Sequence, residues 1–168
     1  MVRGTPPRLL IMARRIDYYD DPEAPEVNSR VPSVNVVATD EAGRVLMIRR
    51  SDNGNWALPG GGIDLGESVP QAGIRETLEE TGVTCEITGI LGTYTDPRHV
   101  ILYTSDGEAR QEFSIVLTAR PVAGEPTTSD ESLEVRWVPR DELPDLQMDR
   151  SMRMRIAHHL SGDGPHIG

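Results

Sequence analysis

Three glutamates and one arginine lie close together just after a glycine-rich turn. Arg75, Glu76, Glu79 and Glu80 belong to a run of mostly helix-compatible residues, and the turn spans residues 58–62. On a helix, positions 76, 79 and 80 have the spacing i, i+3 and i+4, which places the three carboxylates on one face. Like charges at that spacing repel one another unless a cation lies between them. The pattern predicts a divalent metal site that assists the cleavage of a phosphate anhydride.

A solvated helix face is the alternative interpretation, because glutamates on helices are mostly exposed. The preceding turn argues against it. Gly60, Gly61 and Gly62 can bring bare backbone close to a ligand, and their carbonyl oxygens can join carboxylates as ligands of a hard cation. The surroundings of the glutamates therefore favour metal binding.

Capping residues predict the helix that carries the glutamates. Ser68 has an acceptor side chain and Gln71 lies three residues on, which is the pattern of a capping box. Pro70 fits the first turn of a helix, where no hydrogen-bond donor is lost. Gly82 is a typical residue at which a helix ends. Together these residues predict a helix over 69–81.

Short runs rich in β-branched and apolar residues predict strands on both sides of this helix. They lie at 33–39, 45–50, 84–95, 100–104, 112–119 and 134–138. We expect the first two to form a hairpin around a turn at 40–43, and Asp106-Gly107 to form a turn between two later strands. A last helix is predicted over about 149–160. Strands before and after helices indicate an α+β or α/β layered domain.

The residues around the glutamates resemble the signature of the Nudix hydrolase family, G-x5-E-x7-R-E-U-x-E-E-x-G-U, in which U is a bulky aliphatic residue. The matching residues are Gly61, Glu67, Arg75, Glu76, Glu79, Glu80, Gly82 and Val83. Only Thr77 departs, at the first aliphatic position, and its branched side chain should pack where Val or Leu normally would. The resemblance implies an α/β/α sandwich with a mixed β-sheet, the signature helix and a C-terminal helix.

The resemblance also implies roles for the residues of the motif. Glu76, Glu79 and Glu80 are expected to bind Mg²⁺ or Mn²⁺, with the carbonyl of Gly60 as a further ligand. Arg75 is expected to orient a neighbouring glutamate through a bidentate pair, or to form an ordinary i,i+4 pair with Glu79. The motif thus implies a catalytic group of Arg75, Glu76 and Glu79 around a metal.

The general base is open between Glu76 and an acid on a later loop. Glu131, with Asp130 and Glu134 as alternatives, precedes the strand that contains Trp137. Each of these loop acids is otherwise a solvated carboxylate. We select Glu131, because its place in a loop gives it freedom to reach the metal.

Candidate substrate contacts lie on both sides of the motif. Arg49 and Arg50 end a strand near the glycine turn and either bind phosphate or form an exposed strand end. Pro97 lies close to the position of a proline in resembling enzymes that act on ADP-ribose, and His99 belongs to the same loop. The resemblance implies a nucleoside diphosphate derivative as substrate, ADP-ribose or a nucleotide sugar first and nucleoside triphosphates second. A non-catalytic nucleotide-binding module is the alternative.

Composition limits the domain organisation and the partners. The 168 residues suffice for one domain, which we place at 31–160 between an N-terminal extension, 1–30, and a flexible tail, 161–168. The extension packs either on this domain or on a second subunit of a homodimer. The net charge of −10 argues against a broad nucleic-acid surface but not against a small nucleotide bound through metal. No membrane span or signal peptide is evident, so we expect a cytoplasmic protein.

Overall fold

The computed structural model describes residues 14–168, and residues 1–13 of the predicted extension lie outside the described residues. The elements are β1 (Arg15–Tyr19), β2 (Ser33–Ala38), β3 (Val45–Arg50), β4 (Trp56–Ala57), β5 (Gly60–Gly62), α1 (Val69–Thr81), β6 (Thr84–Tyr94), β7 (His99–Tyr103), β8 (Glu108–Gln111), β9 (Ser114–Ala123), β10 (Ser132–Val138), the 3-10 helix η1 (Leu143–Asp145), α2 (Arg150–Ser161) and β11 (His166–Ile167).

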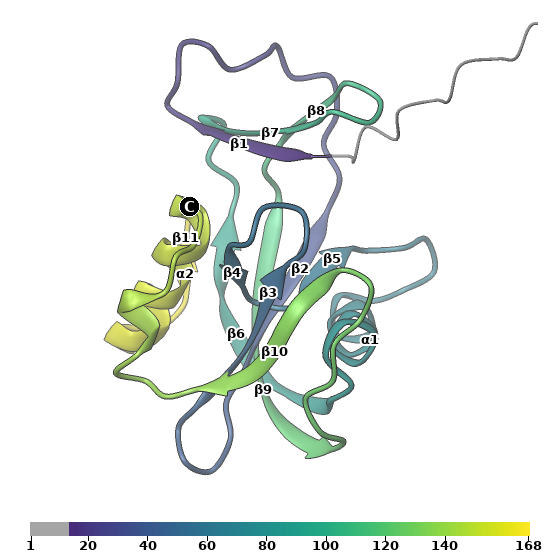
Figure 1. The fold of residues 1–168 in the computed structure, drawn as a ribbon. Helices are drawn as coiled ribbons and strands as arrows, with labels where there is room; N and C mark the ends of the chain where they lie inside the picture. The colour runs from purple at the N-terminus through teal and green to yellow at the C-terminus, as the bar shows by residue number, and fades with distance from the viewer. Residues whose placement is uncertain (1–13) are drawn as a thin grey trace, which may run out of the picture.

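The strands form three sheets, of which two lie between the two helices. The largest sheet has the order β11-β6-β9-β2-β5, and its parallel β2/β9 pair and antiparallel β6/β9 pair make it mixed. The second has the order β10-β3-β4 and the third β1-β7-β8. Figure 1 shows α1 and α2 on opposite sides of the strands, with β1, β7 and β8 at one end of the molecule. The predicted α+β sandwich with a mixed sheet is confirmed.

The signature helix forms as its capping residues predict. Ser68 and Gln71 make both hydrogen bonds of a capping box, and the helix spans Val69–Thr81. Gly82 ends it in the left-handed conformation, with φ of 73°. The sequence therefore sets both ends of the helix, and with them the position of the three glutamates.

Small side chains bring this helix close to the large sheet. Ala72 is fully buried against Val34 and Leu117, and a Cβ on Gly73 would lie 3.1 Å from a methyl group of Val36. Thr77, the one departure from the family pattern, is also fully buried. Its hydroxyl donates to the carbonyl of Gly73 at 2.8 Å, so the extra polar group has a partner within the helix. Thr77 thus packs in place of an aliphatic residue.

The predicted hairpin at 33–50 is wrong. β2 pairs with β9 along its whole length, and residues 33–35 pair with β5 on the other edge. β3 pairs instead with β10 and β4, and only a single bridge between Thr39 and Val45 joins the two segments. The turn after β2 carries the chain from one sheet to another. Val45, Leu46, Met47 and Ile48 are all buried, as expected of a strand covered on both faces.

The structure also differs from the prediction in two connecting regions. The Asp106-Gly107 turn leads into β8, which pairs with β7 and was not predicted, and the following strand begins at Ser114 rather than at residue 112. The segment 161–168, predicted as a flexible tail, contains β11, whose two residues pair in parallel with Gly92 and Thr93 of β6. A strand so short carries too little pattern to be seen in a sequence.

The N-terminal extension packs on the domain in its described part. β1 pairs with β7 along its whole length, from Arg15 opposite Tyr103 to Tyr19 opposite His99. The extension therefore contributes the edge strand of the third sheet. Within residues 14–168, no helix is long and apolar enough to cross a membrane.

The close approach of β5 to β2 predicts that two glycines of β5 differ in how well they tolerate replacement by alanine. A Cβ on Gly60 would lie 2.0 Å from the carbonyl oxygen of Val34, whereas a Cβ on Gly62 would meet nothing within 4 Å. Gly60→Ala should therefore lower the free energy of unfolding by about 3 kcal/mol, and Gly62→Ala should change it by less than about 0.5 kcal/mol. Urea unfolding of both variants is the measurement. Equal losses would show that this approach does not constrain the turn.

Candidate active site

A cleft opens between the glycine turn, the start of α2 and the third sheet. Its volume is about 240 Å³. Glu80, Glu131 and the backbone of Gly60 to Gly62 line its acidic part, and side chains of β1, β7, β8 and α2 line the rest. The cleft therefore joins the signature helix to the segment before β2, which lies far from it in the sequence.

Glu80 is the most buried carboxylate of the signature helix. Its side chain comes from α1, only 8% of the residue is exposed, and its Oε2 accepts a hydrogen bond from the amide of Gly60 at 2.9 Å. Burial raises the pKa of Glu80 to about 7, and the nearby charges of Glu76 and Glu131 act in the same direction. Glu80 is thus a buried acid whose charge is incompletely offset by the protein.

Arg75 binds the other carboxylates of the motif together. Its Nε and Nη2 donate to both oxygens of Glu67 at 2.6 and 2.9 Å, and its Nη1 donates to Glu76 at 2.9 Å and to Glu79 at 3.1 Å. Nη2 also donates to the carbonyl of Gly62 at 3.2 Å. Both arrangements expected for Arg75 are therefore present: the bidentate pair, which is with Glu67, and the i,i+4 pair with Glu79.

Glu76 and Glu79 differ in how closely they approach the glycine turn. The Glu79 side chain is 59% exposed, whereas that of Glu76 is 15% exposed. A Cβ on Gly61 would lie 2.6 Å from Oε1 of Glu76, so the carboxylate occupies the space that a side chain there would need. Burial raises the pKa of Glu76, and the charges of Glu79 and Glu131 raise it further.

The ligand atoms at this end of the cleft suit a hard divalent cation. Carboxylate oxygens and glycine backbone are the donors available, and Mg²⁺ or Mn²⁺ prefers such oxygens to nitrogen or sulfur. Within residues 14–168, no three His, Cys, Asp or Glu side chains are already arranged as a metal site. Arg75 holds Glu76 and Glu79, and the carboxylate of Glu80 faces the amide of Gly60.

Glu131 is the loop acid that the structure brings to the cleft. It lies just before β10 and lines the cleft beside Glu80, and its charge raises the pKa of both Glu76 and Glu80. Asp130 and Glu134, the alternatives, are not among the lining residues, and Glu134 pairs with Arg136 at 3.3 Å. Of the three loop acids, Glu131 alone lines the cleft.

Four arginines line the cleft, and each already has a carboxylate partner. The pairs are Arg15 with Asp17 at 2.8 Å, Arg50 with Asp52 at 2.7 Å, Arg110 with Glu108 at 2.7 Å and Arg155 with Glu112 at 3.1 Å. Of these four arginines, Arg50 is the one predicted from the sequence, since the other three come from elements whose proximity no local spacing reveals. Because these charges are paired within the protein, little free positive charge remains for a phosphate.

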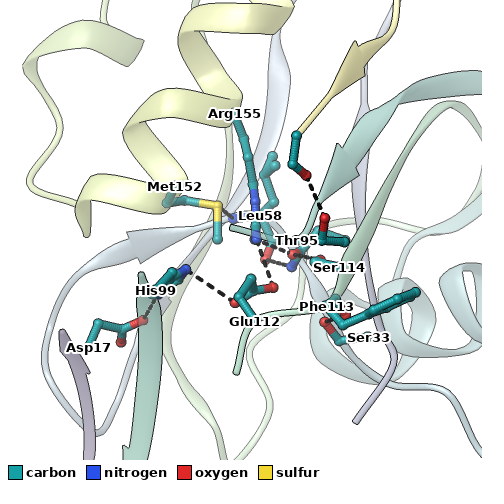
Figure 2. A network of polar contacts seen from close by, with 12 residues as sticks. Asp17, Ser33, Leu58, Thr95, His99, Glu112, Phe113, Ser114, Met152 and Arg155 are labelled. Atoms are coloured by element: carbon teal, nitrogen blue, oxygen red, sulfur yellow. Dashed lines mark hydrogen bonds and ion pairs between the residues drawn. The ribbon is translucent and has the colours of Figure 1, made fainter. Parts of the chain in front are cut away.

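The other predicted substrate contacts do not line the cleft. Arg49 is exposed and donates to the carbonyl of Gly54 at 3.3 Å, and Pro97 is exposed. His99 is buried, with Nε2 at 2.8 Å from Asp17 and Nδ1 at 3.4 Å from Glu112. Figure 2 shows His99 between these two carboxylates, with Glu112 continuing to Arg155. The two ring nitrogens of His99 therefore face protein carboxylates rather than the cleft.

Comparison with known proteins connects the chain to one family. The model of the NUDIX domain matches residues 29–158. A MutT-like protein of Streptomyces ambofaciens is 37% identical over 136 residues, which cover 80% of this chain and 80% of that protein. An ADP-ribose pyrophosphatase of Methanocaldococcus jannaschii is 35% identical over 114 residues, which cover 63% of this chain and 60% of that protein.

A solved structure agrees with the fold. The crystal structure of a NUDIX hydrolase from Nitrosomonas europaea matches with a TM-score of 0.67 and 23% identity, over 84% of this chain and 78% of that one. At that identity the likeness concerns the arrangement of helices and strands. The family match begins after β1 and ends before β11.

The raised pKa of Glu80 predicts how the stability of the metal-free protein depends on pH. The folded-state pKa is about 7 against an ordinary 4.5, so the folded state binds this proton more tightly than the unfolded state. The free energy of unfolding should therefore fall as pH rises from about 4.5 to 7, by up to about 3 kcal/mol from this group. Glu80→Gln should remove that part of the fall, since a neutral amide has no charge to repel Glu76 and Glu131 or to attract Arg50.

Urea unfolding in EDTA at several pH values, for wild type and Glu80→Gln, measures this difference. Other titrating groups are common to both proteins and cancel in the comparison. If the free energies of unfolding of the two proteins change in parallel over this pH range, the pKa of Glu80 is not raised as its burial implies.

Proposed function

The chain belongs to the Nudix hydrolase family, and from this premise we propose that it hydrolyses the phosphate anhydride of a nucleoside diphosphate derivative, with ADP-ribose or a nucleotide sugar as substrate. The observation that carries this proposal is the charge distribution of the cleft. Glu80 and Glu131 form an acidic end with the charge of Glu76 nearby, while the arginines of the cleft are already paired. A substrate diphosphate therefore needs a divalent cation to enter.

We propose that Glu76, Glu79, Glu80 and the backbone of Gly60 hold Mg²⁺ or Mn²⁺. A metal bound there supplies activation of water and stabilisation of charge on the phosphoryl oxygens. Two hydrogen bonds to the oxygens of Glu67 hold Arg75 in place. Arg75 would in turn keep Glu76 and Glu79 oriented. The amide of Gly60 would hold the carboxylate of Glu80 at the edge of the turn.

We assign the general base to Glu131. Within residues 14–168 its carboxylate makes no hydrogen bond or ion pair, whereas that of Glu76 is tied to Arg75 at 2.9 Å. A free carboxylate on the cleft wall can accept the proton of the attacking water as its oxygen bonds to phosphorus and the anhydride P–O bond breaks. Glu76 is the second candidate, because its carboxylate lies against the glycine turn and burial raises its pKa.

Charge favours a diphosphate derivative over a nucleoside triphosphate. A triphosphate brings more negative charge into a cleft whose arginines are already neutralised by carboxylates. The uncharged moiety of a diphosphate derivative can instead lie against the remaining wall, where Ile101, Tyr103 and Phe113 offer apolar and aromatic surface. The relative from Methanocaldococcus jannaschii, named as an ADP-ribose pyrophosphatase, supports the same substrate class.

Metal dependence is the first test of this function. EDTA should abolish turnover, and Mg²⁺ or Mn²⁺ should restore it. Glu80→Gln should lower kcat by about 100-fold or more, while metal-free stability at pH 7 holds or rises because carboxylate repulsion is relieved. Glu41→Gln, an exposed residue on the turn after β2, is the matched control and should leave kcat unchanged. Full activity in EDTA would exclude the mechanism.

Substrate choice is the second test. Phosphatase-coupled phosphate release should be measured with Mg²⁺ for ADP-ribose, nucleotide sugars, dinucleoside polyphosphates and deoxynucleoside triphosphates. We expect ADP-ribose to be cleaved to AMP and ribose 5-phosphate with a higher kcat/KM than any triphosphate. A far higher kcat/KM for a deoxynucleoside triphosphate would establish the triphosphate alternative. Tight binding of a nucleotide without turnover of any substrate would indicate a binding module.

A further inference from the structure

The glycine turn of the active site has no side chains of its own to hold it in place. β5 consists of three glycines, and it pairs with residues 33–35 of β2 at the edge of the large sheet. Glycine has more backbone freedom than any other residue. The amide of Gly60 donates to Glu80 at 2.9 Å, and its carbonyl is one of the ligands proposed for the cation. The geometry of the metal site therefore depends on contacts that neighbouring elements make with this turn.

The side chain of Asn35 on β2 makes such a contact. Asn35 lies opposite Gly60 in the β2/β5 pair, and a Cβ on Gly60 would lie 2.6 Å from its Nδ2. The same Nδ2 donates to the carbonyl oxygen of Leu58 at 3.4 Å and to that of Pro59 at 3.5 Å. These hydrogen bonds are long, so one amide group spans the two carbonyls that lead into the turn. Asn35 thus contacts three successive residues at the start of the turn.

The oxygen of the Asn35 amide is held by a side chain of α2. Nη1 of Arg155 donates to Oδ1 of Asn35 at 2.6 Å, and the hydroxyl of Ser114 donates to the same oxygen at 3.4 Å. A guanidinium can only donate hydrogen bonds and a backbone carbonyl can only accept them, so the two ends of the amide cannot exchange places. Arg155 therefore determines that the NH2 group of Asn35 faces the glycine turn.

Arg155 is itself fixed by burial and by an ion pair. Its side chain is only 3% exposed, and its Nη2 donates to the buried carboxylate of Glu112 at 3.1 Å. Figure 2 shows this contact, with His99 on the other side of Glu112. A buried, close-packed side chain has few other positions open to it. The contacts from α2 through Asn35 to the turn thus hold the amide of Asn35 in one orientation.

We propose that Asn35, oriented by Arg155, is a positioning residue of the metal site. Its amide keeps Gly60, and with it the backbone group that binds Glu80, in place beside the signature helix. This inference rests on the proposed function, because it assumes that the glycine turn takes part in metal binding. It adds to the site a residue of another strand, which lies outside the signature segment 61–83.

Binding of Mn²⁺ to the substrate-free full chain tests the proposal, with the free ion measured by electron paramagnetic resonance. Asn35→Ala removes the amide and leaves Arg155 its pair with Glu112. The dissociation constant for Mn²⁺ should rise about tenfold, which corresponds to roughly 1.4 kcal/mol. In hydrolysis, the Mg²⁺ concentration that gives half the maximal rate should rise in parallel. Saturating Mg²⁺ should largely restore kcat, because metal affinity rather than the chemical step is impaired.

Ser33→Ala is the matched control on the same strand. Ser33 lies two positions before Asn35, on the same face of β2, and its hydroxyl donates to the carbonyl of Phe113 at 3.2 Å. The variant loses a side-chain hydrogen bond of β2 but none to the glycine turn, so it should bind Mn²⁺ as wild type does. An equal loss of affinity in Ser33→Ala would overturn the proposal, since any loosening of β2 would then weaken the site.

Asn35→Asp decides the case if Asn35→Ala does not fold. A carboxylate has the shape of the amide and gives Arg155 a stronger acceptor, so this variant should fold. It has no donor for the carbonyls of Leu58 and Pro59. Its affinity for Mn²⁺ should therefore fall, although the added negative charge by itself would attract a cation. Unchanged or tighter Mn²⁺ binding by a folded Asn35 variant would overturn the proposal.

Failure of this proposal can be distinguished from failure of the proposed function. A wild-type protein that binds no Mn²⁺ would overturn both the metal site and the role of Asn35 that rests on it. A wild-type protein that binds Mn²⁺ and hydrolyses its substrate, together with an Asn35→Ala variant of unchanged affinity, would overturn only the role of Asn35.

Discussion

The site depends on the hydrogen bonds that one guanidinium donates to several carboxylates. Arg75 holds Glu67 at both oxygens, reaches Glu76 and Glu79, and donates to the carbonyl of Gly62. It thereby ties the loop before the helix, the helix itself and the glycine turn into one unit. Without this cation the acids of the motif, which lie before the helix and on its C-terminal half, would repel one another.

Glu80 receives no hydrogen bond from Arg75, and its environment lowers the stability of the folded protein. The carboxylate is buried, accepts one backbone hydrogen bond and lies near two other acids, so its pKa rises to about 7. Such an arrangement destabilises the metal-free protein at neutral pH. A cation bound among these oxygens would reverse the balance, because it would offset the repulsion that raises the pKa. The local instability and the proposed metal binding thus have one physical cause.

The sequence predicts what local spacing determines and misses what distant segments bring together. The helix, its caps and the places of Glu76 and Glu80 follow from periodicity and capping residues within one short segment. The hairpin prediction failed because strand partners depend on which sheet edges are free. Arg155 and Glu112 could not be found, since nothing local indicates that they meet. His99 was assigned to the substrate, but two protein carboxylates hold it.

The buried ion pairs give the N-terminal strand a part in the wall of the cleft. Hydrogen bonds from His99 and Arg15 hold the pKa of Asp17 well below its usual range, although burial alone would raise it. His99 continues to Glu112, and Glu112 to Arg155 on α2. Removing one member would leave a buried charge without its partner, which is strongly unfavourable. The extension is therefore coupled through a line of polar contacts to α2, which lines the cleft.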